Sequence, residues 1–407
     1  MSSASSLTQG DWQRALADGQ TRAAELFSRP ESEQKRLGYY HTLREICQQP
    51  WTWLRTCDRM LASRDELARD LKGIQCLVLT GSGSSEYAGE CVRLPLQNEL
   101  RICTESISGG TLVMYGGKAL PKGRPGLLIS LARSGESPES RGVVALLMEM
   151  EPEFRHLVIT CNEQGSLATS WRDHRKVQII TLPSETNDKS LVMTSSFTNL
   201  LLAARFMGML ERPGEYQKLC ERLSDITRDL IRSNFDALAK IAASGFRRAV
   251  FLGSGPRFAA SREAALKMLE MTAGRVATLC ETFLGFRHGP MSYVQNDTLV
   301  VCCLSCDPTL RAYELDLLRE LDRKKLGLLR VIVGEDIPSS VVRKGDEVIE
   351  CRGLGNLNDE DSPTVYVIVA QLLAFFRCMD EGLSPDSPSQ DGVISRVVEK
   401  FPLHAPL

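Results

Sequence analysis

The sequence lacks a strong charge of either sign, a long hydrophobic run and a basic leader. Its 407 residues carry 49 Lys and Arg against 51 Asp and Glu, a formal net charge of −2, which gives no support to nucleic-acid binding. The longest apolar run, Thr364 to Phe376, is too short to cross a bilayer and predicts a buried strand or helix. No basic segment followed by an apolar core opens the sequence. We therefore expect no signal peptide and no membrane partner.

Histidine is scarce and cysteine is scattered. The five histidines show no H-x-x-x-H spacing, so we predict no metal site and expect no cofactor. The 13 cysteines are odd in number and lie in apolar segments, such as those around Cys76 and Cys161, which favours reduced thiols in a cytoplasm. The single C-x-x-C, Cys303 to Cys306, has no second pair of ligands. Buried thiols at the end of a strand explain it better than a redox or zinc site.

The most informative stretch runs from Leu127 to Ser140 and reads LLISLARSGESPES. Its apolar start is typical of a buried parallel strand, and Pro138 suits the first turn of a helix. The N–H groups that open a helix lack partners, and the helix dipole favours negative charge. Arg133 adds a cation suited to phosphate oxygens, and Ser134 and Ser137 add hydroxyls. The stretch predicts a phosphate-ester site, with an ordinary strand–helix turn and an N-cap serine as the alternative.

A second stretch has the same design. The apolar run Leu77–Thr80 is followed by Gly81-Ser82-Gly83-Ser84-Ser85-Glu86-Tyr87. Glu86 stands where the dinucleotide fingerprint has its third glycine, so the G-x-G is weak evidence for NAD. The two serine-rich turns lie about 50 residues apart. They fit neighbouring loops at the carboxyl ends of one parallel sheet, where such folds bind ligands.

The alternation of strands and helices predicts an α/β fold with parallel sheets. Strands are expected at Ile74–Leu79, Leu127–Ser130, His156–Thr160 and Val177–Thr181. The pattern then repeats, since Arg248–Leu252 leads into Gly253-Ser254-Gly255, 172 residues after Gly81. Later strands are expected at Thr298–Leu304, Leu329–Val333 and Glu347–Cys351. We therefore expect two copies of one domain.

The domain bounds follow from this repeat. We expect an N-terminal helical arm at 1–45, a first domain at 46–212, a second domain at 225–395 and a C-terminal tail at 396–407. Trp51 and Trp53 are expected to pack the helical region before the first sheet onto the body of the protein. In the second copy the turn Leu304–Pro308 lacks the glycine and the arginine, and Asp307 would repel an anion. We therefore expect one phosphate site per chain, in the first domain.

The second copy contributes titratable groups instead. Glu263, Lys267 and Glu270 share one face of a predicted helix, and a solvated stripe with an ion pair is the simpler interpretation. The segment Thr278 to Met291, TLCETFLGFRHGPM, follows. Its His288 precedes Gly-Pro and must lie on a loop, where functional residues concentrate.

These motifs carry a family resemblance. From about residue 40 the chain resembles the double sugar-isomerase (SIS) family, as in the isomerase half of glutamine:fructose-6-phosphate amidotransferase. Arg133–Ser137 is similar to that family's Ser-Gln-Ser-Gly-Glu-Thr, and Gly83-Ser84-Ser85 to its Gly-Thr-Ser loop. The helix ending at Glu270 and the His288-Gly289-Pro290 segment also have counterparts. The blocks SLARSGESPES, ETNDKSLVMTSSFTN and RHGPMS resemble the AgaS-type galactosamine-6-phosphate deaminase/isomerases of N-acetylgalactosamine catabolism.

The resemblance implies a role for each matched residue. His288 would open the sugar ring, donated by a neighbouring subunit, so a homodimer or higher homo-oligomer with shared active sites is expected. Glu270 would carry the proton between C1 and C2. Lys267 would hold Glu270 or polarise the sugar oxygen, and Glu281 is a weaker candidate for binding or orientation. The residues expected to hold the phosphate are Gly83, Ser84, Ser85, Arg133, Ser134, Gly135 and Ser137.

The chain also departs from the amidotransferase pattern. Ala132 and Arg133 replace a serine and a glutamine, and Ser195 stands where the amidotransferase has a lysine. The family's C-terminal lysine, which closes over the sugar, has no clear counterpart. Arg396 is the nearest candidate for that role.

The expected direction of the chemistry follows from an absence. The sequence begins Met1-Ser2-Ser3 and shows no glutaminase domain with an N-terminal cysteine nucleophile. Release of ammonia needs only the sugar domains, so the expected reaction is galactosamine 6-phosphate plus water giving tagatose 6-phosphate plus ammonia. A fructosamine-6-phosphate deglycase and a ketose/aldose phosphate isomerase are alternatives. A regulator that senses a sugar phosphate is a third, but it would need no Glu270/His288 pair and would usually carry a DNA-binding arm.

Overall fold

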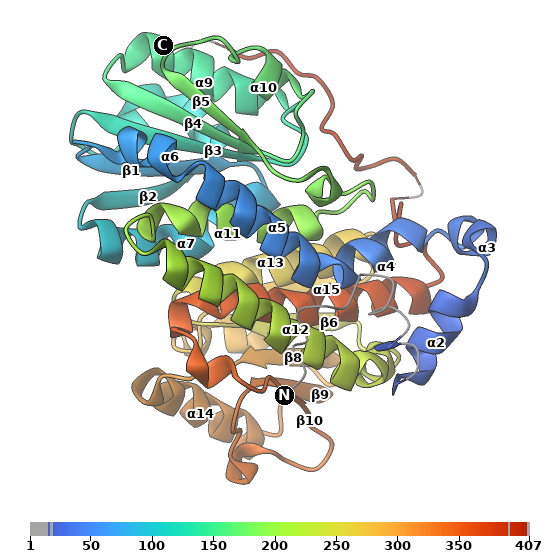
Figure 1. Cartoon of the computed structure of the whole chain (residues 1–407). Coiled ribbons are helices and arrows are strands. Elements are labelled where there is room, and N and C mark those ends of the chain that lie inside the picture. Colours follow the sequence, from blue (N-terminus) through green and yellow to red (C-terminus); the bar gives the residue numbers. More distant parts are fainter. Residues whose placement is uncertain (1–14, 17–18, 390, 405–407) are drawn as a thin grey trace. The chain divides into compact units, whose positions relative to one another are not determined.

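A computed structural model describes residues 15–16, 19–389 and 391–404, and Figure 1 shows its alternating helices and strands. The helices before the first sheet are α2 (Thr21–Ser28), α3 (Glu31–Arg36), α4 (Tyr40–Cys47), α5 (Gln49–Ala62) and α6 (Arg64–Leu71). The first sheet consists of β1 (Cys76–Gly81), β2 (Cys103–Ser108), β3 (Gly126–Ala132), β4 (Phe154–Thr160) and β5 (Val177–Thr181). Its helices are α7 (Ser84–Leu100), α8 (Gly109–Tyr115), α9 (Pro138–Met150), α10 (Ser166–Thr169) and α11 (Ser195–Arg205).

The long helix α12 (Pro213–Ala242) leads to the second sheet. The strands of that sheet are β6 (Arg248–Leu252), β7 (Ala277–Glu281), β8 (Thr298–Cys303), β9 (Leu329–Gly334) and β10 (Glu347–Glu350). Its helices are α13 (Pro256–Met271), α14 (Pro308–Arg323) and α15 (Pro363–Asp380). Short 3-10 turns lie between these elements, among them η5 (Gly285–Arg287), η6 (Pro290–Tyr293) and η9 (Asp359–Asp361).

The two sheets share one topology. Every strand pair is parallel, and the orders are β2-β1-β3-β4-β5 and β10-β9-β8-β6-β7. The second order, taken from its other edge, is the same as the first. The chain therefore contains two copies of one α/β unit, as the sequence repeat predicted. In this topology the switch point lies between the first and third strands of each sheet, where α/β folds bind ligands.

Burial explains why the central strands were predictable. Every residue of β1, β3 and β8 is buried, because helices cover both faces of each sheet. In Figure 1, α9 and α10 lie on one side of the first sheet and α7 and α11 on the other. Strands covered on both faces read as continuous apolar runs. The apolar runs in the sequence therefore predicted these strands.

Two strands escaped prediction, and both are edge strands. β2 (CTESIS) and β7 (ATLCE) each lie at the end of a sheet and are largely half-buried. Because only one neighbouring strand and part of each face cover them, they tolerate polar residues and carry no apolar run. Edge position is a property of the sheet, which periodicity along one segment does not reveal.

The apolar run at Thr364 to Phe376 forms most of α15. One helical segment that includes it, Asp359–Asp380, is long and apolar enough to cross a membrane, but 94% of its most apolar window is buried inside the protein. It packs extensively against α13. The segment is a core helix, one of the two interpretations that its sequence allowed.

The described residues form two compact units that are not continuous in sequence. Unit 1 holds the described part of residues 1–51, residues 189–192 and the described part of 221–391, which contain the second sheet. Unit 2 holds residues 52–188 and 193–220, with the first sheet, and the described part of 392–407. The sequence-based domain bounds followed the linear order of the chain and stay a proposal. By contacts, the N-terminal arm packs with the second sheet and the C-terminal segment with the first.

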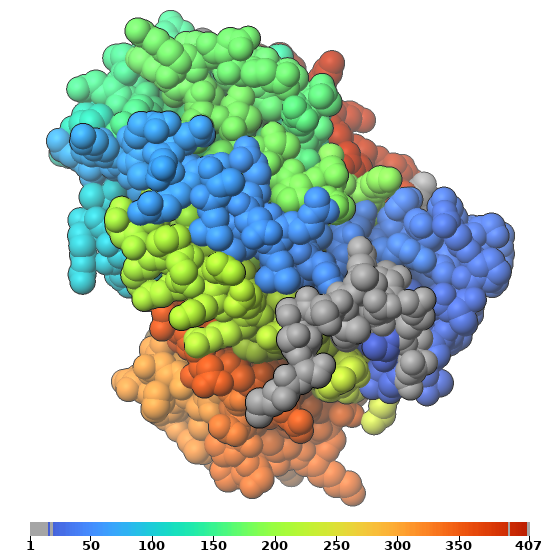
Figure 2. Space-filling model, in the orientation of Figure 1, coloured from blue at the N-terminus to red at the C-terminus, as the bar shows by residue number. Residues whose placement is uncertain are grey.

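The contacts of the N-terminal arm show how it is held within unit 1. The Asp236 carboxylate on α12 accepts the backbone N–H of Thr21 at 2.9 Å and of Arg22 at 2.8 Å. These N–H groups open α2 and have no partner within that helix. Figure 2 shows the arm, in deep blue, at the surface of the molecule. Residues 1–14 of the expected arm lie outside the described residues.

Trp53 has the packing role expected for it. Its indole is fully buried, and Nε1 donates to the Thr198 hydroxyl of α11 at 2.9 Å. Both residues belong to unit 2. A buried indole needs such a partner because its N–H loses water on folding. Trp51 is only half-buried and stacks against the Arg228 guanidinium, 5.6 Å from its ring centroid.

We predict that Trp53→Ala lowers the free energy of unfolding by about 3–5 kcal/mol, because it leaves a cavity and removes the hydrogen bond to Thr198. Denaturant unfolding with far-ultraviolet circular dichroism measures the change. Val393→Ala is the control, since Val393 is 85% exposed and its truncation should cost less than about 0.5 kcal/mol. Equal losses for the two variants would contradict the packing role.

Candidate active site

The turn after β1 needs glycine at two positions. A Cβ on Gly81 would lie 2.6 Å from the carbonyl carbon of Ser85, and Gly83 has a φ of +57°, which L side chains rarely adopt. This geometry starts α7 directly at the strand end. Ser84 and Ser85 fill its first turn and are buried, and the Ser85 hydroxyl contacts the Met193 sulfur at 3.8 Å. The predicted serine loop therefore stands at a helix N-terminus.

The turn after β3 places the other expected phosphate residues. Arg133 is buried, Gly135 has a φ of +65°, and Ser137 occupies the N-cap position of α9. The Ser137 side chain makes no cap hydrogen bond. Its hydroxyl pairs instead with that of Ser140 at 2.6 Å. Ser137 thus stands at the N-cap position, but its hydroxyl bonds to another hydroxyl and not to a helix N–H group.

A neighbouring loop supports the β3 turn from behind. The Asn162 side chain donates to the Ser134 carbonyl at 2.9 Å, and the Ser166 hydroxyl donates to the Gly135 carbonyl at 3.0 Å. The Glu136 carboxylate accepts the N–H of Ser166, also at 2.9 Å. These contacts engage the Ser134 and Gly135 carbonyls and fix the turn to the loop after β4. Asn162 and Ser166 were not predicted, because they follow the next strand and no motif marks them.

A small hollow lies at the switch point between β1 and β3. It is lined by Thr80, Gly81, Ser82, Gly109, Ser130, Leu131, Ser140, Val143 and Leu167. The Thr80 hydroxyl and one Glu139 carboxylate oxygen are buried and have no hydrogen-bond partner among the described residues. Gly109 lies beside the Glu139 side chain, since a Cβ there would lie 3.4 Å from it and 3.2 Å from the Ser82 hydroxyl. Unpaired polar groups beside a concave surface are typical of a ligand site.

Arg396 lies beside the β3 turn through its backbone. The Arg133 guanidinium donates to the Arg396 carbonyl. The Arg396 side chain turns to another loop, where it donates to the Asp188 carbonyl at 2.6 and 2.8 Å and to the Asn187 amide oxygen at 2.7 Å. The C-terminal segment thus reaches the expected phosphate turn. The Arg396 guanidinium itself is held by protein groups, so its expected role in closing over the sugar stays a proposal.

Asp188 is a buried residue that the sequence analysis missed. Its carboxylate accepts the N–H groups of Thr194, Ser195 and Ser196 at 2.8 to 3.1 Å, and so caps the start of α11. Burial raises the pKa of this carboxyl above its ordinary value, although the Ser196 hydrogen bond and the Arg133 charge oppose the shift. An acidic residue six positions before a Thr-Ser-Ser run is the signal that could have found it. The Ser195 position that holds a lysine in the amidotransferase is also buried at this cap.

The predicted acid–base cluster lies in the other unit, on α13. Lys267 donates to Glu270, and its ammonium lies 3.5 Å from a Glu263 carboxylate oxygen. Lys267 and Glu263 are fully buried, whereas the Glu270 side chain keeps 23% of its exposure. The solvated-stripe interpretation is therefore wrong, because the helix presents this face to the protein interior. A buried ammonium that touches two carboxylates has a fixed position and fixes Glu270 in turn.

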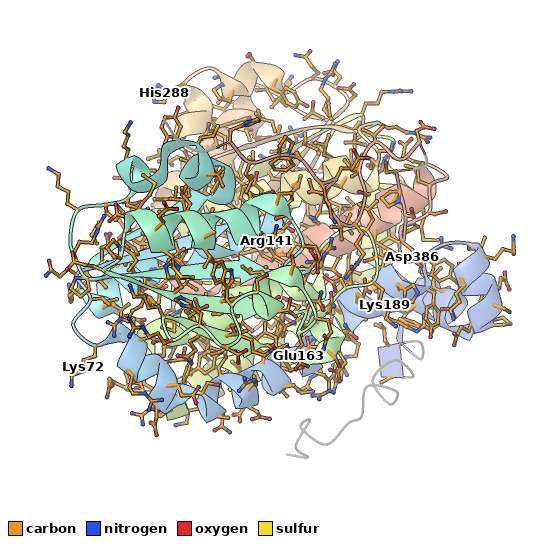
Figure 3. All side chains as sticks on the ribbon, turned by 90° about the horizontal axis from the view of Figure 1, so that it is seen from above. Lys72, Arg141, Glu163, Lys189, His288 and Asp386 are labelled. Atoms are coloured by element: carbon orange, nitrogen blue, oxygen red, sulfur yellow. The ribbon has the colours of Figure 1, made fainter. Side chains whose placement is uncertain are left out.

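His288 lies on a loop, as predicted. It follows η5 and precedes η6, and its side chain is exposed. Figure 3 places it at the outer edge of the molecule. Gly289 has a φ of +122° and permits the sharp turn that follows. Arg287 ties the loop to α14 by an ion pair to Glu320 at 2.8 Å.

Glu281 shapes the start of the same loop. It ends β7, and its carboxylate accepts the Thr282 N–H at 2.7 Å and the Thr282 hydroxyl at 3.2 Å. That hydroxyl accepts the Gly285 N–H at 3.0 Å. Glu281 thus fixes the start of the loop that carries His288, and its proposed role in substrate binding or orientation stays a proposal.

Most of the cysteines are buried thiols, whereas Cys103 is exposed and Cys280 and Cys306 are half-buried. All 13 are free, and burial raises the pKa of Cys303 to about 12. Such a thiol stays protonated and unreactive at neutral pH. Within the described ranges, no group of three His, Cys, Asp or Glu side chains is placed to hold a metal ion.

The site residues therefore fall into two sets. The phosphate residues Gly83 to Ser85 and Arg133 to Ser137, with Arg396, lie in unit 2, whereas Lys267, Glu270, Glu281 and His288 lie in unit 1. Within unit 2 the two turns end adjacent strands, β1 and β3. Within unit 1 the cluster on α13 is joined by its own ion pairs.

Comparison with known proteins places the chain. A D-galactosamine-6-phosphate deaminase AgaS from Shewanella sp. is 35% identical over 370 residues, covering 89% of this chain and 91% of that protein. An AgaS protein of Streptomyces coelicolor is 36% identical over 374 residues, covering 90% and 95%. The chain belongs to the AgaS family. No family model matches it.

Solved structures agree with this assignment. The tagatose-6-phosphate ketose/aldose isomerase of Escherichia coli has a TM-score of 0.80 and 32% identity, covering 87% of this chain and 95% of that chain. The C-terminal domain of a Francisella tularensis glucosamine-fructose-6-phosphate aminotransferase has a TM-score of 0.73 at 18% identity, covering 85% and 98%, which establishes the shared fold alone. The AgaS family and its neighbours process sugar phosphates, so a sugar phosphate is the class of substrate for which this site is built.

We predict that Arg133→Ala weakens the binding of a sugar phosphate by roughly 10- to 150-fold, since a charge-assisted hydrogen bond contributes about 1.5–3 kcal/mol. Ser134→Ala should weaken it less. Isothermal titration calorimetry with galactosamine 6-phosphate measures both. Arg141→Ala is the matched control. Arg141 is an exposed arginine on α9 (Figure 3), and its substitution removes the same charge as Arg133→Ala. If the Arg133 and Arg141 variants bound galactosamine 6-phosphate equally well, the assignment of Arg133 to phosphate binding would be wrong.

Proposed function

We propose that the chain is a deaminating isomerase that converts galactosamine 6-phosphate and water to tagatose 6-phosphate and ammonia. The observation that carries the proposal is the Lys267–Glu270 pair in a chain of the AgaS family. It supplies one exposed carboxylate held by a buried ammonium. Deamination of a 2-amino aldose needs a base that moves one proton from C2 to C1. The resulting C2 imine is then hydrolysed by water, and ammonia leaves.

The phosphate would be held in unit 2. The N–H groups that open α7 and α9, the Ser85 and Ser134 hydroxyls and the Arg133 guanidinium are the donors that the two turns offer. Helix N-termini stabilise a phosphate through unpaired N–H groups and the dipole.

Glu270 would be the general base and Lys267 its positioning partner. A carboxylate fixed by a buried ammonium keeps one geometry, which favours proton transfer between adjacent carbons. Glu263 balances the charge of Lys267 from the other side. This arrangement leaves Glu270 as the carboxylate of the cluster that reaches the surface.

His288 would open the pyranose ring as an acid–base group, and we propose that it serves the active site of a second subunit. Its exposure supports this arrangement, because a histidine on an outer loop can reach a neighbouring chain. The proposed assembly is a homodimer or a higher homo-oligomer. The 13 free cysteines support a cytoplasmic location, where thiols stay reduced.

Ketose/aldose isomerisation of tagatose 6-phosphate is a second candidate, favoured by the 32% identity to a solved protein named for that activity. The same base would move a proton between C1 and C2 of a sugar without nitrogen. A sugar-phosphate regulator and a fructosamine-6-phosphate deglycase are favoured by no comparable observation.

A coupled ammonia assay across amino sugar 6-phosphates tests the proposal. We expect stoichiometric ammonia and tagatose 6-phosphate from galactosamine 6-phosphate, and little reaction with galactosamine itself. Isomerisation of tagatose 6-phosphate without ammonia release from any amino sugar phosphate would favour the second candidate.

We predict that Glu270→Gln lowers the turnover rate by about 10²–10⁴-fold, because it keeps the shape but removes the base. It should also abolish exchange of the C2 hydrogen with solvent, followed by nuclear magnetic resonance in deuterated water. Glu149→Gln is the control, since Glu149 is an exposed carboxylate on α9. Normal exchange in the Glu270 variant would assign the base elsewhere.

His288→Asn should fail differently. It should slow turnover of the ring-closed sugar while leaving hydrogen exchange measurable with an open-chain ketose, whereas the exposed His174→Asn should change neither. If subunits share active sites, a purified hybrid of Glu270→Gln and His288→Asn chains should regain part of the activity, because some mixed sites receive both native groups. A well-formed hybrid no more active than its parents would place His288 in its own chain or outside the reaction.

A further inference from the structure

The turn after β6 in the second sheet has the same backbone conformation as the turn after β1 in the first sheet. A Cβ on Gly253 would lie 2.4 Å from the Arg257 carbonyl oxygen, just as one on Gly81 would collide with Ser85. Gly255 has φ +56° and ψ −131°, and Gly83 has φ +57° and ψ −125°. The backbone therefore presents the same helix N-terminus at the switch point of both sheets.

The arginine and the serine have exchanged turns between the two copies. Ser85 on α7 corresponds to Arg257 on α13, and Arg133 after β3 corresponds to Ser305 after β8, each pair 172 residues apart. The sequence analysis found no arginine in the second copy because it compared only the turn after β8. The second copy retains one arginine, one serine and the helix N–H groups, which is a set of donors suited to an oxyanion.

In this chain a carboxylate of the protein occupies the arginine and the serine of that set. Asp359, in η9, accepts the Ser305 hydroxyl at 2.7 Å and the Cys306 N–H at 2.9 Å with one oxygen, and Arg257 with the other. Glu314 accepts the second Arg257 nitrogen at 2.8 Å and the Ser305 N–H at 2.6 Å. Arg257 and Glu314 are almost fully buried, and the Asp359 side chain keeps 18% of its exposure.

Asp307 does not have the role expected for it. Its carboxylate accepts the N–H groups of Thr309 and Leu310, both at 2.9 Å, and so caps α14. It therefore satisfies helix N–H groups instead of repelling an anion. The donors around Asp359 exceed what one carboxylate uses, because Arg257 Nε and the Ser261 hydroxyl are buried without a partner among the described residues. The Ser261 hydroxyl lies at the β6 turn, 2.7 Å from the position of a Gly253 Cβ.

We propose that the second SIS copy retains an oxyanion site that the chain fills with its own Asp359 carboxylate. Removal of that carboxylate would convert the turn into a binding site for a small tetrahedral oxyanion, phosphate or sulfate. The inference concerns the second sheet alone and stands whether or not the proposed reaction is correct. It gives a physical reason for one phosphate site per chain, since the second site is already occupied.

The charges of the cluster agree with this assignment. Burial alone would raise the pKa of Asp359, but the Arg257 guanidinium and its hydrogen bonds hold it below its ordinary value. Asp359 is therefore an anion at neutral pH. Burial raises the pKa of Glu314, against the opposing charge of Arg257. Asp359 is also the more exposed of the two carboxylates.

The test compares Asp359→Ala with its parent, both carrying Arg133→Ala and Ser134→Ala to silence the first turn. In chloride, Asp359→Ala should lower Tm by on the order of 5–10 °C, because it removes one of the two carboxylates that pair with the buried Arg257 and takes away the acceptor of the Ser305 hydroxyl. Inorganic phosphate at constant ionic strength should restore at least half of the loss. Calorimetry should find one more phosphate per chain than in the parent.

Asp346→Ala is the matched control. Asp346 is a fully buried carboxylate paired with the fully buried Arg330 near the start of β9, away from the strand-end turns. Its loss should destabilise the protein without rescue by phosphate. Asp359→Asn should also be destabilised without rescue, because the amide still fills the space.

Three results would overturn the proposal. The first is equal rescue of the Asp346 and Asp359 variants by phosphate, and the second is no additional phosphate bound by Asp359→Ala. The third is that no folded Asp359→Ala can be recovered from either phosphate or chloride buffer. That result is decisive because the emptied oxyanion site should bind phosphate during folding.

Discussion

The backbone N–H groups at the carboxyl ends of the two parallel sheets need hydrogen-bond acceptors. The two copies of the fold differ in the groups that serve as those acceptors. Each sheet ends its first strand in a glycine turn that starts a helix immediately, and the first N–H groups of a helix have no acceptor within the helix itself. Turn carbonyls supply part of the need, since the Ser85 N–H donates to Ser82 at 3.3 Å and the Arg257 N–H to Ser254 at 3.1 Å. In the first copy we propose that the phosphate of the substrate is a further acceptor.

The second copy meets the same requirement internally. Its arginine comes from the helix and its serine from the strand end, the reverse of the first copy. Asp359 and Glu314 then satisfy both. The two copies thus share one backbone conformation at the strand-end turn and differ in a few side chains. In the second copy Asp359 occupies the arginine and the serine.

A buried charge also organises the candidate catalytic residues. Lys267 cannot remain charged in the interior without partners, and Glu263 and Glu270 supply them from the same helix. Because Glu263 is wholly buried and Glu270 is not, the pair divides into one carboxylate that balances charge and one that reaches the surface. The spacing along α13 placed all three on one face. Only packing decided which of them faces outward.

The sequence by itself determined the central strands, the two glycine turns, the helical face of Lys267 and the loop of His288. Each of these depends on neighbours within a few residues: apolar runs, glycine conformations, helical periodicity and Gly-Pro. The edge strands β2 and β7, the Asp188 cap, the Arg133 contact with Arg396 and the Asp359 contact with Arg257 were decided by the tertiary structure. Edge position depends on how strands are ordered in a sheet. The Arg133–Arg396 and Arg257–Asp359 contacts join segments that lie more than 100 residues apart in the sequence. Local pattern holds no information about such pairs, because their energy exists only once the sheets have formed.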